Sequence, residues 1–186
     1  NYNTVVGDEA GTAITTGDRN TAVGFEAGLG TTTGSKNVAV GSYSLKANTT
    51  GISNIAVGDV SLNVSTTGSY NVAVGKAALG ANTTASNNTA VGHNSLAANT
   101  TGTENVAVGA LALDANTTAS YNTAVGLNSL GANTTGEANS AVGRSSMLLN
   151  TTGIQNAALG VNALYNNTSA SNNTAVGYQS LLANTT

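Results

Sequence analysis

Few side chains in this sequence could carry acid–base, nucleophilic or metal chemistry. Cysteine is absent, His93 is the only histidine, and Asp8 and Glu9 form one pair of adjacent carboxylates. A catalytic pair needs a second group across the substrate, and a metal site needs several ligands at one place. No His, Cys or acidic cluster has such a spacing. We therefore predict no enzyme, no metal site and no cofactor.

Tyrosine offers a different chemistry, since an aromatic ring can stack on a sugar or anchor a protein interface. Five tyrosines are candidate surface contacts: Tyr43, Tyr70, Tyr121, Tyr165 and Tyr178. The alternative is that these rings are ordinary surface residues without a ligand.

Asparagine offers a third chemistry, because Asn-x-Thr/Ser is the acceptor sequence for N-glycosylation. The candidate acceptors all occupy one position of a repeat: Asn48, Asn82, Asn99, Asn116, Asn133, Asn150, Asn167 and Asn184. The alternative is structural, a ladder of stacked amides and hydroxyls that bond to one another at a turn. The paired threonines that follow could instead match ordered water on an ice-binding solenoid. Alternation would turn only one threonine of each pair outward, which weakens that reading.

All of these residues belong to a strict repeat. Eleven glycines, from Gly7 to Gly177, fall 17 residues apart without an insertion or deletion. A fixed period predicts a stack in which each repeat, or rung, contacts only its neighbours. We expect one continuous array over residues 1–186, an all-β parallel solenoid of eleven rungs. The glycines assigned a structural role are Gly41, Gly58, Gly75, Gly92, Gly109 and Gly126.

A short β-branched segment precedes each glycine, such as Asn-Val-Ala-Val-Gly at 37–41. Alternation predicts that the valine before the glycine faces the core. The nearly invariant alanine then packs closely against either a second chain or the other wall of a thin coil. A second strand is expected at 96–101 and 130–135, where the sequence reads Leu-x-Ala-Asn-Thr-Thr. The asparagines four residues before the glycines are assigned a structural role in ladders: Asn37, Asn54, Asn71, Asn88, Asn105 and Asn122.

Five positions of the repeat carry the variation: one, two, five, eleven and twelve residues after the glycine. Every charged residue of the chain occupies one of them, which marks these positions as the outside. The net charge is −3 with only five Lys and Arg, so we expect no nucleic-acid partner. No apolar run is long enough to cross a bilayer.

The segment 37–41, with Ser44 three positions beyond its glycine, resembles the head repeats of trimeric autotransporter adhesins, and phage tail-fibre proteins contain similar repeats. The resemblance implies a left-handed parallel β-roll, three chains side by side, and display on a cell surface or virion. It also implies binding to a host surface, glycan or matrix. The 17-residue period and the Asn-Thr-Thr segment depart from the family motif. Because both ends fall inside the repeat, we expect an excerpt of a longer fibre.

The sequence thus predicts a structural and adhesive segment of an extracellular or phage tail fibre, which displays a variable surface for multivalent attachment. One alternative is a self-assembling extracellular matrix filament, glycosylated and without a receptor, which lengthens end to end. A further alternative is an ice-binding solenoid.

Overall fold

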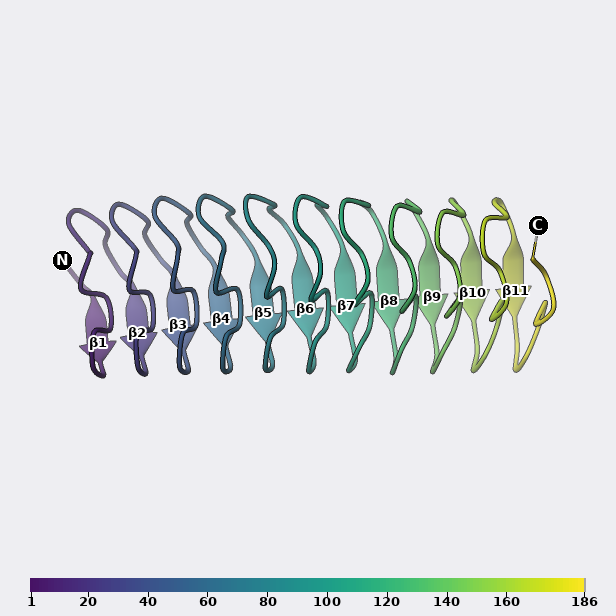
Figure 1. Ribbon diagram of the computed structural model, residues 1–186, viewed down its shortest axis with the longest axis horizontal. Coiled ribbons are helices and arrows are strands. Elements are labelled where there is room, and N and C mark those ends of the chain that lie inside the picture. Colours follow the sequence, from purple (N-terminus) through teal and green to yellow (C-terminus); the bar gives the residue numbers. More distant parts are fainter. Residues whose placement is uncertain (186) are drawn as a thin grey trace.

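The computed structural model describes residues 1–185 and consists of one parallel sheet and the turns that connect its strands. The strands stack in chain order, and each pairs in register with the strand 17 residues further on (Figure 1). The result confirms the predicted all-β parallel solenoid. The strands are β1 Thr4–Val6, β2 Thr21–Val23, β3 Val38–Val40, β4 Ile55–Val57, β5 Val72–Val74, β6 Thr89–Val91, β7 Val106–Val108, β8 Thr123–Val125, β9 Ser140–Val142, β10 Ala157–Leu159 and β11 Thr174–Val176.

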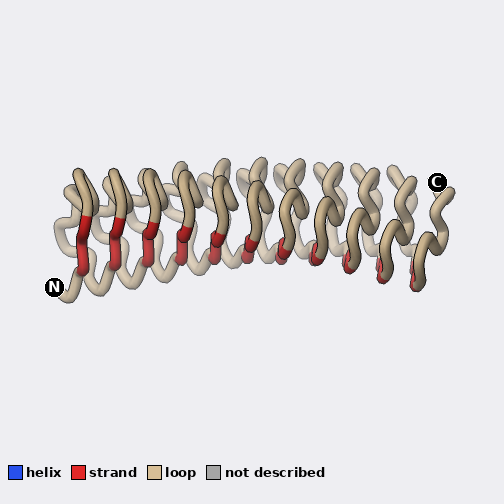
Figure 2. The backbone as a smooth tube through the Cα atoms, turned by 90° about the horizontal axis from the view of Figure 1, so that it is seen from below, coloured by secondary structure: helices blue, strands red, loops and turns tan. Residues whose placement is uncertain are grey.

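Each rung contains one strand and not the two that the sequence predicts. The segments 96–101 and 130–135 are turns and bends, and Figure 2 shows the strands along one side with loops elsewhere. Leu96 and Leu130 have φ angles of 49° and 52°. These left-handed values interrupt an extended backbone. Hydrogen bonds between rungs still continue here, for example from the Leu96 amide to the Ala112 carbonyl at 3.0 Å.

The prediction of which strand residue faces the core is also wrong. The central alanine points inward, and Ala73 and Ala90 have no exposed surface. The residues on either side point outward, so that Val108 of β7 is 37% exposed. Leucines from the turns, such as Leu79 and Leu96, pack in the same core cluster and fill most of the narrow interior. The remaining space accepts a methyl group, so the alanine packs inside its own coil.

The repeat glycines lie where successive rungs approach most closely. Gly41 has a φ of 128°, a conformation that residues with a side chain rarely adopt. A Cβ added to Gly41 would lie 2.6 Å from the carbonyl oxygen of Gly58 in the next rung. The same contact recurs at Gly58, Gly75, Gly92, Gly109 and Gly126. Glycine therefore recurs every 17 residues because the backbones of successive rungs stack too closely here for a side chain.

The asparagines that precede the strands, which we call the strand asparagines, form a buried ladder. The Asn54 Oδ1 accepts a hydrogen bond from the Asn71 amide at 3.0 Å, and the Asn54 Nδ2 donates to the Gly68 carbonyl at 2.8 Å. One side chain thus satisfies backbone groups of two rungs inside the coil. The other predicted members, Asn37, Asn71, Asn88, Asn105 and Asn122, are buried and bonded in the same way.

A second ladder runs through the asparagines seven residues after the glycines, the turn asparagines. The Asn116 Nδ2 donates to the Asn99 Oδ1 at 2.9 Å and to the Ala119 carbonyl at 3.0 Å. Next to it, the Thr100 Oγ1 donates to the Thr117 carbonyl at 3.0 Å. Bonded polar side chains thus fill part of the interior beside the apolar core.

The five variable positions lie on the outside, as the charge pattern predicts. Within residues 1–185, no residue at these positions is fully buried. Ion pairs form there between neighbouring charges, the shortest of which joins the Lys46 Nζ to the Glu26 Oε2 at 2.6 Å. The fold therefore separates a fixed scaffold from a variable surface.

Candidate functional site

Two features of the surface are candidates for function, and the larger is the outward side of the sheet. We define the sheet face as the first and third residues of strands β1–β11. The third residue is Val in ten strands and Leu159 in β10, and the first is Val, Ile, Thr, Ser or Ala. No charged residue lies on this face. At about 4.8 Å per strand, it forms a strip roughly 50 Å long and 10 Å wide.

Charged and aromatic residues border the sheet face on both sides. The position before the strand asparagine holds Lys36, Tyr70 and Tyr121, and the position after the repeat glycine holds Lys76 and Arg144. An apolar strip with a polar rim is typical of a surface that contacts another protein. Strand alternation alone places these valines in the core, so the sequence pattern does not predict this strip.

The five predicted contact tyrosines do not form one cluster. Tyr70 and Tyr121 are exposed on the rim that precedes the strands, three rungs apart. Tyr178 is exposed near the C-terminal end, while Tyr43 and Tyr165 are half-buried on the turns that follow the glycines.

Tyr43 belongs to a small cluster whose members satisfy one another. The Tyr43 and Phe25 rings form an edge-to-face pair with 5.2 Å between centroids, and the Lys46 Nζ lies 4.9 Å from the centre of the Tyr43 ring. The Glu26 carboxylate pairs with the same lysine. With ring and charges already paired, this cluster fits a stabilising role on the outer surface better than a ligand site.

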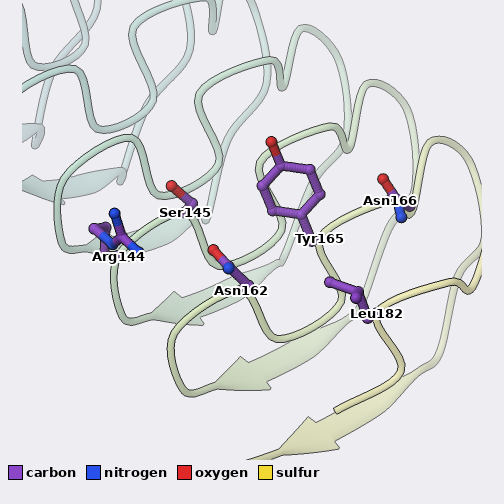
Figure 3. A pocket seen from close by; sticks show the side chains of 6 residues that line it. All are labelled: Arg144, Ser145, Asn162, Tyr165, Asn166 and Leu182. Atoms are coloured by element: carbon purple, nitrogen blue, oxygen red, sulfur yellow. The ribbon is translucent and has the colours of Figure 1, made fainter. Parts of the chain in front are cut away.

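Tyr165 belongs to the second candidate feature, a surface hollow of approximately 400 Å³. Figure 3 shows the ring beside the Asn162 amide, with Arg144 across the hollow. These side chains come from the turns after β9, β10 and β11, and the lining residues are Arg144, Ser145, Asn162, Tyr165, Asn166 and Leu182. The hollow forms because Arg144 and Tyr165 are long while Asn162 between them is short. The sequence predicts Tyr165 as a contact but does not single out its polar neighbours.

The predicted glycosylation sites are incompatible with this fold. Asn48, Asn82, Asn99, Asn116, Asn133, Asn150 and Asn167 have no exposed surface. Their Nδ2 atoms, which would carry the sugar, donate hydrogen bonds inside the coil. Asn184 is half-buried, and its Nδ2 donates to the Asn167 Oδ1 at 3.2 Å. The acceptor sequence is present because the ladder needs asparagine and threonine, which was the structural alternative.

The threonine pairs contribute one outward row, as alternation predicts. The first threonine of each pair bonds to the next rung, as Thr49 does to the Thr66 carbonyl at 3.0 Å. The second is exposed, for example Thr50, Thr67 and Thr84.

Three titratable groups have shifted pKa values, and they lie on different rungs. A hydrogen bond from the Tyr2 amide lowers the pKa of Asp18, and the Glu26 carboxylate raises the pKa of Lys46. Burial raises the pKa of Asp114. His93 is exposed, as are Asp8 and Glu9.

Across residues 1–185, no group of three or more His, Cys, Asp or Glu could hold a metal ion. The same part of the chain has no helix of the length and apolar character that crossing a membrane requires. Comparison with protein-family models, with curated proteins and with solved structures finds no match for the chain.

Proposed function

We propose that this chain is a structural and adhesive segment of an extracellular or phage tail fibre, in which three copies associate side by side through the sheet face. The observation that carries the proposal is the uncharged strip of Val, Leu, Ile and Thr along strands β1–β11. Its area of roughly 500 Å² lies within the range of about 300–600 Å² for the largest apolar patch on a soluble protein, a patch that often has a function.

The period of the strip favours a second copy of the chain as the occupant. The face repeats the same valine every rung, at about 4.8 Å. A globular partner has no such period, whereas a second rod matches it along its whole length. Three copies that turn their strips toward one axis bury roughly 1,500 Å² in total, which exceeds the roughly 1,000 Å² lower limit for a specific interface. This arrangement agrees with the resemblance to trimeric adhesin heads.

The variable surface supports the adhesive part of the proposal. Tyr70, Tyr121 and Tyr178 stand exposed on rungs whose scaffold is internally bonded. A rigid rod that carries several such groups can attach through many weak contacts. Three associated rods triple the number of contacts on one fibre.

Light scattering of the purified chain tests the association. We expect a mass three times that of the 18.1 kDa chain. The variant V74K/V108K places two lysines on the sheet face and should give a monomer with an unchanged circular dichroism spectrum. The matched control T84K/T118K places the same charges on the outward threonine row, and it should remain associated. A wild-type monomer, or equal behaviour of the two variants, contradicts the proposal.

Electron microscopy separates this proposal from the end-to-end matrix filament. Discrete rods of one length support a fibre segment, whereas fibrils that lengthen with concentration support the filament. Beads coated with the chain test adhesion directly. They should bind a cultured cell layer better than albumin-coated beads, and equal binding removes the adhesive role.

A further inference from the structure

We infer that the hollow around Tyr165 is a binding site for an acidic carbohydrate, with Arg144 as the residue that selects a sugar carboxylate. The inference rests on the proposed adhesive function and names the ligand class of one contact on that surface. Three observations support it: the geometry of the hollow, the lining side chains that make no hydrogen bonds in the described part of the chain, and the charge of Arg144.

The shape of the hollow fits a sugar ring. It holds approximately 400 Å³ and opens to the surface between the turns after β9 and β11. The Tyr165 ring forms one side, as Figure 3 shows, and the Leu182 side chain lies beyond it. An aromatic face provides apolar contact area at low entropic cost, because the ring has few rotatable bonds.

The polar side chains of the hollow are available to a ligand. None of the side-chain hydrogen bonds found within residues 1–185 uses Arg144, Asn162, Tyr165 or Asn166. The amides of Asn162 and Asn166 offer both donors and acceptors, which is what sugar hydroxyls require. Pockets that bind small ligands combine apolar walls with a few such groups.

Arg144 gives the site its charge preference. Arg19, Lys46 and Lys76 each lie near a carboxylate at 3.7, 2.6 and 3.9 Å. Arg144, like Lys36, belongs to no ion pair within residues 1–185, although the chain as a whole carries a net charge of −3. The planar guanidinium binds a carboxylate through two parallel hydrogen bonds. A uronic acid that stacks on Tyr165 would present its carboxylate to this group.

Titration of the full chain with three probes tests the inference by NMR or calorimetry. The probes are a hyaluronan tetrasaccharide, a neutral N-acetylglucosamine tetramer and a tetraglutamate peptide. We expect the hyaluronan fragment to bind at least 10-fold more tightly than either of the others. Equal binding of the neutral sugar contradicts the role of Arg144, and equal binding of the peptide contradicts a carbohydrate site.

Variants then assign the contacts. R144Q should weaken hyaluronan binding about 10-fold and leave the neutral sugar unchanged, because one charge-assisted contact is lost. Y165A should remove binding of both sugars, while Y165F should retain it. Y2A is the matched control, since Tyr2 is an exposed tyrosine outside the hollow. If R144Q and Y165A bind the hyaluronan fragment as tightly as the wild type does, the hollow is not the binding site.

The binding titration and the bead experiment can fail independently of each other. Coated beads that attach to cells while the hyaluronan fragment fails to bind would overturn this site alone. Binding of the fragment by a chain whose beads do not attach would overturn adhesion and leave the site in place.

Discussion

Asn37 and Asn48 donate hydrogen bonds to the same oxygen, the Gly51 carbonyl, at 2.8 and 3.2 Å. Asn37 is a strand asparagine and Asn48 is a turn asparagine. The two hydrogen bonds therefore connect both ladders to one backbone carbonyl. Asn88 and Asn99 meet at the Gly102 carbonyl in the same way, at 2.9 Å each. The interior of the coil is thus organised around shared carbonyls as much as around apolar contacts.

Removing a strand asparagine should destabilise the rod strongly. In N88A, the Asn105 amide loses its acceptor and the Gly102 carbonyl loses one of its donors. A buried donor without a partner costs a few kcal/mol, so we expect a loss of about 2–4 kcal/mol in the free energy of unfolding. Denaturant titration measures it. The control N63A removes an outward amide and should change stability by less than about 0.5 kcal/mol.

Replacing a repeat glycine should be more damaging still. A Cβ on Gly92, whose φ is 136°, would lie 2.5 Å from the Gly109 carbonyl oxygen. Neither backbone can move without breaking the stack, so G92A should lose more than about 4 kcal/mol or fail to fold. G80A is the control, since its Cβ would lie 3.2 Å from the nearest atom and Ala97 occupies the same position in the next rung. Equal melting temperatures for the two variants would contradict this account.

One rung offers the opposite test, a substitution that should stabilise. Ser65 stands in the row of turn asparagines, and neither its Oγ nor the Oδ1 of Asn48 has a hydrogen-bond partner. S65N would donate to the Asn48 Oδ1 and accept from the Asn82 Nδ2. We expect a gain of about 1–2 kcal/mol by denaturant titration. S65A, which only removes the unpaired hydroxyl, should leave the free energy of unfolding almost unchanged. A larger stabilisation by S65A than by S65N would contradict the idea that S65N restores the two ladder bonds.

Asp114 should make the rod less stable as pH rises. Burial raises its pKa in the folded chain above the ordinary value of 3.8. The stabilising contribution is therefore complete below pH 3.8 and is lost as pH rises through the raised folded value. D114N should melt at a higher temperature than the wild type at pH 7, with the difference disappearing below pH 3.8. E104Q, which removes a carboxylate at an exposed position, should melt like the wild type, and a pH-independent difference for D114N would refute the assignment.

Much of this fold follows from periodicity. The glycine spacing predicts the stacked rungs, and the placement of every charge predicts which positions face solvent. Alternation also predicts that neighbouring residues such as Ala73 and Val74 lie on opposite faces. It does not identify the inner face, because in so thin a coil the larger residue is the one excluded.

The predicted second strand and the predicted glycosylation sites are wrong for the same reason. Both predictions use side-chain types alone, without the conformation of the backbone. The apolar Leu96 suggests a strand, yet it lies in a left-handed turn and still reaches the core. Asn99 matches a glycosylation acceptor, yet its amide is enclosed by the ladder. The sequence does not predict the hollow at Arg144 for a different reason, because the hollow depends on side chains from three different rungs.

The interruption at Ser65 has a mechanical consequence. Because each rung contacts only its neighbours, a pull along the rod loads all the interfaces in series. The force at which the rod yields is then set by its weakest interface and not by its length. The bonds between turn asparagines run without a break from Asn82 to Asn184 and are absent between Asn48, Ser65 and Asn82, so we expect the weakest interface on the N-terminal side of Asn82. Extending the rod by further rungs would increase its reach without increasing the tension that it can bear.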